Sequence, residues 1–97
     1  MNCECVEIMK GVPWLDTVDQ EHIPLEILNT CEQVITVDVN VFTPSKETLY
    51  KSGVKVPGSG RQGIEVVTDK YYEFLEVEVR LKEGRDICKK SFVIRLR

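Results

Sequence analysis

The sequence has little of what enzymes and nucleic-acid-binding proteins usually need. Its 97 residues include a single histidine, His22, and 13 Lys and Arg residues are outnumbered by 16 Asp and Glu, for a net charge of −3. Nucleic acid phosphates demand a concentrated basic face. We therefore expect no nucleic-acid partner, and we attribute the locally basic stretch at residues 80–97 to outward charges on exposed strands.

Long apolar runs are missing as well. No window approaches the roughly 20 apolar residues that a membrane-spanning helix requires. The first ten residues, MNCECVEIMK, have neither the basic start nor the apolar stretch of a secretory signal. These absences predict a chain that is made in the cytoplasm without a signal peptide and that has no membrane partner.

The sequence shows little helical periodicity. Apolar and polar residues instead alternate with a period of two. No helical run reaches two clean turns, although residues 19–29 could hold a short helix beside Pro24. Residues 34–43 place Ile35, Val37, Val39 and Val41 on one face, which is typical of a half-buried strand. Residues 71–81 and 86–97 repeat the pattern, and weaker strands are expected at residues 5–9, 23–28, 49–56 and 64–68. About seven short strands predict an all-β fold: a single-domain antiparallel β-sandwich over residues 6–97, jelly-roll or immunoglobulin-like.

The last two strands are expected to form a hairpin. Opposed residues of an antiparallel pair share a face, which requires an even number of loop residues. A two-residue loop at Glu83-Gly84, or a four-residue loop at residues 82–85, would set Leu75 opposite Phe92. Either loop turns Cys88 toward the interior together with Phe92.

No motif predicts catalysis or cofactor binding. His22 follows acidic residues in a polar stretch, which favours a solvated loop histidine over a catalytic base. Residues 58–63 spell G-x-G-x-x-G, but a strand-like segment follows them where a dinucleotide site needs a helix, so we interpret them as a flexible turn. Two residues are candidates for contact with a partner: Arg61 in this turn, and Trp14, which the sequence otherwise favours as part of the core.

Four cysteines, Cys3, Cys5, Cys31 and Cys88, are the most informative feature. Zinc sites favour two closely spaced pairs, and here the second pair is split, so zinc is kept only as an alternative to a protein without bound metal. Cys31 and Cys88 are predicted to be buried or structural, and could bridge one another if adjacent. Residues 1–5 are predicted to be a flexible arm. The Cys3 and Cys5 side chains of this arm could reach a neighbouring subunit more easily than they could form disulfides within their own domain.

A tail with Cys3 and Cys5, followed by the strand Val6-Glu7-Ile8 and a β-sandwich, resembles small self-assembling proteins of bacterial endospore outer layers. These include coat and exosporium proteins and the subunits of endospore appendages. In appendage subunits, an N-terminal connector carrying cysteines locks into the next jelly-roll subunit through disulfides. The resemblance implies that Cys3 and Cys5 form intermolecular disulfides, with another copy or with another coat or appendage protein, on the spore surface. This chain departs from the pattern of those connectors at Cys3-Glu4-Cys5, since the connectors carry adjacent cysteines followed by a third.

The leading prediction is therefore a non-enzymatic structural subunit that self-assembles through sheet edges and intermolecular disulfides. Oxidation after the mother cell lyses would explain cysteines in a chain without an export signal. The alternative is a small β-sandwich binding module, or a virion tail or head-completion component. In that case Trp14 and residues 57–63 would meet the partner.

Overall fold

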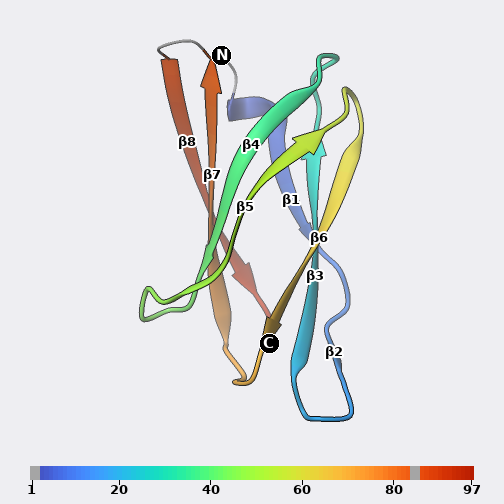
Figure 1. The fold of residues 1–97 in the computed structure, drawn as a ribbon, viewed down its shortest axis with the longest axis vertical. Coiled ribbons are helices and arrows are strands. Elements are labelled where there is room, and N and C mark those ends of the chain that lie inside the picture. The colour runs from blue at the N-terminus through green and yellow to red at the C-terminus, as the bar shows by residue number, and fades with distance from the viewer. Residues whose placement is uncertain (1–2, 84–85) are drawn as a thin grey trace.

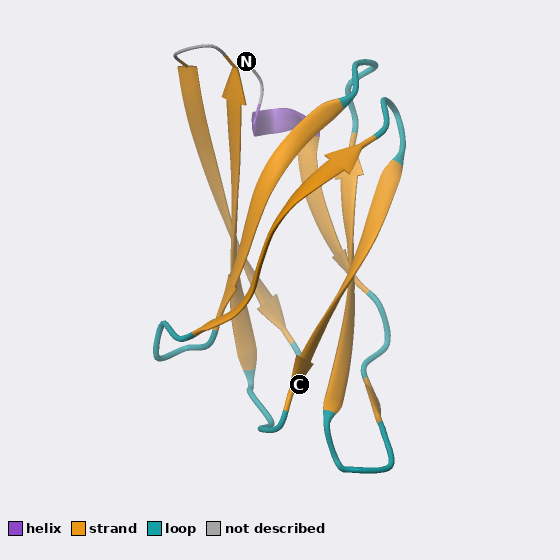
Figure 2. Ribbon diagram, in the orientation of Figure 1, coloured by secondary structure: helices purple, strands orange, loops and turns teal. Residues whose placement is uncertain are grey.

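In the part of the chain that the structure describes, eight strands form two antiparallel sheets that pack face to face (Figures 1 and 2). The computed structural model describes residues 3–83 and 86–97. A short 3-10 turn, η1 (Cys3–Cys5), precedes the strands β1 (Val6–Lys10), β2 (Trp14–Leu15), β3 (Glu21–Asn29), β4 (Ile35–Phe42), β5 (Thr48–Val56), β6 (Arg61–Thr68), β7 (Phe74–Glu83) and β8 (Asp86–Arg95). The predicted all-β sandwich is confirmed, with the two-residue strand β2 as an addition.

The strand order matches the immunoglobulin-like alternative. In the first sheet, sheet A, β3 lies between β6 on one side and β1 and β2 on the other. Sheet B has the order β5-β4-β7-β8. The chain crosses between sheets after β3, β5 and β6, while β8 stays beside β7 as the last strand of an immunoglobulin-like domain does.

Alternation along the central strands builds the core. Each of these strands turns every second side chain inward, where it meets the facing sheet. The inward side chains in the middle of β3, β4 and β7 are at most 1% exposed: Ile23, Leu25, Ile27, Val37, Val39, Val41, Leu75, Val77 and Val79. All nine are Ile, Val or Leu, so the centre of the core is aliphatic.

Strand β3 occupies the segment for which a short helix was considered, and that alternative was wrong. Pro24 is tolerated inside the sheet because the neighbouring strand is interrupted beside it, between Lys10 and Trp14 (Figure 1). The Gly11 N–H donates to the Pro24 carbonyl oxygen at 2.8 Å. The N–H that proline lacks would point toward this same edge, where the regular pairing of β1 has ended, so the proline does not break a continuous ladder.

The β7–β8 hairpin is confirmed, but its predicted register was wrong by two residues. Leu75 lies opposite Ile94, not Phe92, and Glu83 pairs with Asp86. The connecting residues 84–85, on which the loop prediction falls, lie outside the described part of the chain. A shift of two residues keeps every side chain on its face, so parity alone could not distinguish the two registers.

Residues 58–60 of the glycine-rich segment form a turn that hydrogen bonds hold in place, whereas residues 61–63, also predicted to be turn, already belong to strand β6. The Ser59 N–H donates to the Cys31 carbonyl at 2.7 Å, and the Asn29 N–H donates to the Gly60 carbonyl at 2.9 Å. Asn29 is only 2% exposed, and its side-chain amide donates to the Gln33 carbonyl at 2.7 Å. The turn therefore closes one end of the sandwich.

Gly58 should be essential to this closure. A Cβ atom at this position would lie 1.8 Å from the Glu32 carbonyl oxygen, so the two loops would have to separate. We expect Gly58→Ala to lower the free energy of unfolding by about 2 kcal/mol or more, measured by urea denaturation. Gly53→Ala is the matched control, because its Cβ would meet nothing closer than 3.6 Å. Equal stability of the two variants would contradict this role.

Candidate functional site

The four cysteines form two disulfides within the chain. Cys3 bonds to Cys88 on β8, and Cys5 bonds to Cys31 in the loop after β3. Among the described residues no cysteine is free. Cys5 is buried, whereas Cys31 and Cys88 are half-buried and do not bond to each other.

This pairing corrects the prediction of a free N-terminal arm. Residues 3–5 form the turn η1, and both of its cysteines are cross-linked to the body of the same chain. Cys3 and Cys5 are therefore not available for disulfides to another subunit in this structure, and the connector part of the spore-layer resemblance fails. Residues 1–2 lie outside the described range. The zinc alternative fails as well, because it required four thiolates in one place.

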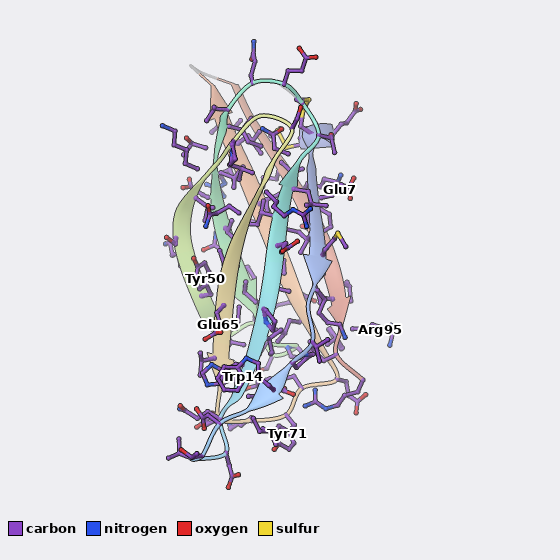
Figure 3. The ribbon with its side chains drawn as sticks, turned by 90° about the vertical axis from the view of Figure 1, so that its right-hand side faces the viewer. Glu7, Trp14, Tyr50, Glu65, Tyr71 and Arg95 are labelled. Carbon is purple, nitrogen blue, oxygen red and sulfur yellow. A yellow bond between two sulfur atoms is a disulfide. The ribbon has the colours of Figure 1, made fainter. Side chains whose placement is uncertain are left out.

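Trp14 lies on the outer face of sheet A, where it is 50% exposed (Figure 3). Its position in the core, which the sequence favoured, is wrong. Its ring stacks on the imidazole of His22, with ring centroids 3.9 Å apart and planes within 12°. Strand β2 pairs Trp14 directly with His22, so the backbone register creates the stack. One face of the indole is therefore covered by the imidazole.

His22 is not a loop histidine. It lies on β3, and a carboxylate contacts each ring nitrogen: Glu65 Oε1 lies 2.8 Å from Nδ1, and Asp16 Oδ2 lies 2.8 Å from Nε2. The hydrogen bonds to Glu65 and then to Asp16 raise the pKa of His22 above its usual 6.5. The bond from His22 lowers the pKa of Asp16 below 3.8, assisted by the N–H groups of Gln20 and Val18.

These two pKa shifts act on stability in different pH ranges. A raised histidine pKa stabilises the fold fully below pH 6.5, and this contribution is lost as the pH rises through the folded-state pKa. A lowered aspartate pKa stabilises the fold above pH 3.8, and that contribution is lost as the pH falls through the folded-state pKa. Between pH 3.8 and pH 6.5 the stabilising contributions of both His22 and Asp16 are therefore fully present.

We call the outward side of sheet A around this stack the Trp14 face. Its members alternate with the core residues of β1, β3 and β6 or lie on β2: Glu7, Met9, Trp14, His22, Pro24, Glu26, Leu28, Arg61, Gly63, Glu65 and Val67. Met9, Trp14 and Val67 are all at least 39% exposed. Apolar side chains exposed together on one face are typical of a contact surface.

Arg61, the other predicted contact residue, also lies on the Trp14 face. It is the first residue of β6, and its guanidinium donates to Glu26 Oε2 at 3.1 Å. Glu7 is likewise paired, with Lys90 at 3.2 Å. Most charged groups of this face therefore have a partner of opposite sign within the chain.

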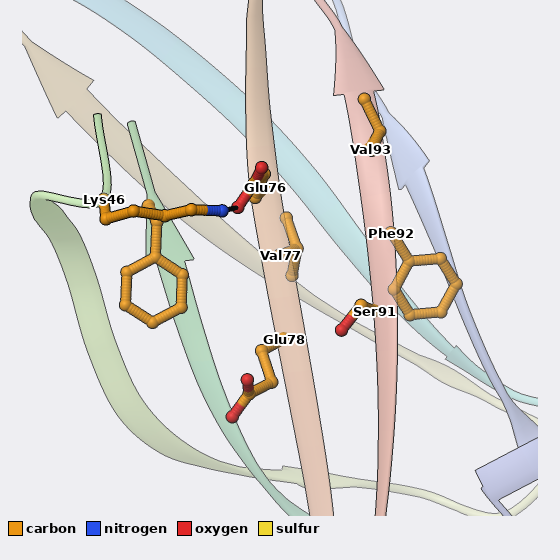
Figure 4. Close-up of a pocket in the computed structure, with 8 residues that line it drawn as sticks. Lys46, Glu76, Val77, Glu78, Ser91, Phe92 and Val93 are labelled. Atoms are coloured by element: carbon orange, nitrogen blue, oxygen red, sulfur yellow. Dashed lines mark hydrogen bonds and ion pairs between the residues drawn. The ribbon is translucent and has the colours of Figure 1, made fainter. Parts of the chain in front are cut away.

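The outer face of sheet B carries two shallow hollows. The first, of about 470 Å³, has Phe42 and Val93 as apolar walls, with Glu76, Glu78 and Ser91 between them (Figure 4). The Lys46 ammonium bonds to Glu76 at its rim. The second hollow lies where Gly53 lacks a side chain opposite Asp38, and it is polar.

Sequence reasoning missed the His22 cluster because the strand predicted at residues 23–28 began one residue after His22, which was interpreted as part of a loop. Had the alternation of residues 23–28 been extended by two positions, His22 would have fallen on the outer face and Glu21 on the inner one. Nothing in the sequence, however, indicated that Asp16 and Glu65 meet at this histidine.

Across residues 3–83 and 86–97, no group of three or more His, Cys, Asp and Glu side chains could hold a metal ion. No helix in the same ranges is long and apolar enough to cross a membrane.

The two disulfides should differ in what they contribute to stability. Their sequence separations are 85 and 26 residues, and a longer closed loop restricts the unfolded chain more. Replacing both partners by Ala should cost about 4.5 kcal/mol for Cys3 and Cys88 and about 3.5 kcal/mol for Cys5 and Cys31, measured by urea denaturation. Iodoacetamide should not label the unfolded, unreduced wild type. Labelled cysteines in that sample would contradict the pairing.

Comparisons with known proteins leave the family open. No family model and no curated protein matches the sequence. Among solved structures, a β-glucosidase, DesR from Streptomyces venezuelae in complex with D-glucose, matches 92% of this chain with 8% identity and a TM-score of 0.45. The structural genomics target SoR45 matches 93% of this chain and 83% of its own, with 12% identity and a TM-score of 0.42. The chain spans only 15% of the glucosidase. At these scores the two structures carry no argument about what this protein does.

Proposed function

We propose that the protein is a non-enzymatic assembly module that associates with copies of itself through the Trp14 face. The observation that carries the proposal is Trp14 itself, a half-exposed indole stacked on a histidine that is in turn fixed by two carboxylates. Rigid, half-exposed aromatic side chains are the commonest anchors of protein interfaces. A tryptophan buried in the core would be held by the side chains packed around it and would not need a stacked histidine.

The charge pattern of the Trp14 face favours a second copy as the occupant. Like charges that face each other across an interface cost several kcal/mol. The charged side chains are paired within the chain: His22 with Asp16 and Glu65, Arg61 with Glu26, and Glu7 with Lys90. Two such faces can therefore meet without strong repulsion, although the whole chain carries a net charge of −3.

The two disulfides support a site of action in an oxidising compartment or outside the cell. The proposal keeps self-assembly from the resemblance to spore outer-layer proteins, and it replaces the covalent connector by a non-covalent face. A place on a spore surface would be one such setting. Disulfides that constrain the monomer suit a protein that must stay folded where cellular repair is absent.

A second candidate is a module that binds a separate polypeptide through sheet B. It is favoured by the first hollow, in which an aromatic wall, Phe42, lies beside the carboxylates of Glu76 and Glu78. Aromatic faces and carboxylates together attract guanidinium and ammonium groups. The occupant would be a basic side chain of the partner.

Self-association should depend on Trp14. Wild-type protein is expected to associate reversibly in sedimentation equilibrium, and Trp14→Ser should weaken association about thirtyfold or more, as loss of an interface anchor does. Val93→Ser is the matched control, because Val93 is 62% exposed on the outer face of the other sheet. A wild type that stays monomeric at every soluble concentration, or an equal effect of both variants, would overturn the proposal.

The second candidate predicts weak, saturable binding of N-acetyl-arginine amide. Backbone amide signals of Ser91 and Val93 should shift with added probe in heteronuclear NMR spectra, and Glu78→Gln should reduce the affinity because it removes a carboxylate from the hollow. Glu7→Gln, on the opposite sheet, is the control. Shifts that are linear in probe concentration, or unchanged in Glu78→Gln, would exclude the hollow as a site.

A further inference from the structure

The contacts of His22 fix its charge. A neutral imidazole has one N–H and one lone pair, so it can donate to only one acceptor. Here carboxylate oxygens, which accept when ionised, lie 2.8 Å from both ring nitrogens. With both carboxylates ionised, only the imidazolium form satisfies both contacts at once. The raised pKa of His22 and the lowered pKa of Asp16 agree with this state.

The two carboxylates are not held equally firmly. The Asp16 Oδ1 atom accepts hydrogen bonds from the N–H groups of Val18 at 2.9 Å and Gln20 at 3.0 Å, which fix the carboxylate in the turn before β3. Glu65 has a longer side chain that is 47% exposed, and His22 is its only side-chain hydrogen-bond or ion-pair partner among the described residues. When His22 loses a proton, Glu65 is therefore the partner that leaves, and Nε2–H continues to donate to Asp16.

We propose that His22 is a proton-controlled clamp that sets the charge of the Trp14 face and thereby controls self-association. The inference rests on the proposed function and adds its regulation. In the protonated state, the imidazolium ties β6 to the turn before β3 and supports the indole of Trp14. In the neutral state, Glu65 swings free and the face loses one positive charge, so two docked copies would repel each other.

No other charged group replaces His22 in this role. The elements packed around it carry further charges: Glu21 and Glu26 on β3, Asp19 in the turn, Arg61 on β6, and Lys10 on β1. Glu21 is bonded to Arg97, and Glu26 to Arg61. His22 is the single histidine of the chain, and histidine is the side chain that ordinarily changes charge near neutral pH. Near neutral pH the charge of the face therefore changes chiefly at His22.

The first experiment follows the clamp in the monomer. Because the chain has one histidine and one tryptophan, imidazole ¹⁵N shifts and tryptophan fluorescence each report a single side chain. We expect His22 to titrate above pH 6.5, with both ring N–H groups present below the midpoint and Nε2–H alone above it, and Trp14 emission to change with the same midpoint. Glu65→Gln should move the midpoint toward 6.5, whereas Glu26→Gln should leave it in place.

The second experiment measures association by sedimentation equilibrium well below and well above that midpoint. The dissociation constant of the wild type should rise with pH, by up to about tenfold for each unit by which docking shifts the pKa of His22. His22→Gln keeps a side chain that can stack and donate, but it cannot titrate. Its dissociation constant should be the same at both pH values.

The outcomes separate the inference from the proposed function. A His22 midpoint at or below 6.5, or a single ring N–H in the acid form, would overturn the clamp whatever the association state. Association that responds to Trp14→Ser but has the same pH dependence in wild type and His22→Gln would overturn the control by His22 and leave the proposed function standing. A monomer at every pH would overturn the proposed function and the docking part of the inference together.

Discussion

The two-residue alternation of β3 is the constraint on which most of this structure depends. Inward, Ile23, Leu25 and Ile27 supply one wall of the core. Outward, the same strand carries His22, Pro24 and Glu26 to the Trp14 face. Because β3 pairs with β1, β2 and β6, a register error in this strand would move core residues to solvent and contact residues into the core. Fold and candidate site are therefore set by one pairing.

Both ends of β3 are reinforced by contacts from distant parts of the chain. At its end, buried Asn29 connects two loops, and the next residues lead to Cys31, which bonds to Cys5. At its start, the buried carboxylate of Glu21 receives two hydrogen bonds from Arg97, at 2.7 and 2.9 Å. The two disulfides hold the N-terminal segment against both sheets. A small domain gains much of its stability from such cross-links, because its core is limited.

The outer faces of the two sheets offer different chemistry. The Trp14 face of sheet A combines exposed apolar side chains with internally paired charges, which favours docking against a similar face. The outer face of sheet B is mostly polar and hollowed, with carboxylates beside Phe42. This difference is why we propose association between copies through sheet A and consider a separate partner only for sheet B. It also explains why a titrating histidine matters on the Trp14 face, where one added or lost charge changes the net charge that two docked copies present to each other.

The alternation of apolar and polar residues along the sequence was enough to predict several strands and the direction of their side chains. Alternation at residues 34–43 and 71–81 predicted β4 and β7, parity predicted the β7–β8 hairpin, and Cys88 was correctly turned inward. These predictions succeeded because the direction of a side chain on a strand depends on residues close in sequence. The sequence alone also gave reason to doubt that residues 58–63 bind a dinucleotide, since a strand follows them.

Only the tertiary structure decided which distant residues meet. The disulfide partners Cys3 and Cys88 are 85 residues apart, and Asp16, His22 and Glu65 come from three separate segments. A terminal segment looks free in sequence, but it is fixed when pairing of β1 with β3 brings Cys5 to Cys31. Residues 19–29 likewise allowed a short helix beside Pro24, and only the interrupted neighbouring strand shows how this proline fits inside β3. In each case the physical reason is the same: strand order and register determine long-range contacts, and neither can be read from the periodicity of a single segment.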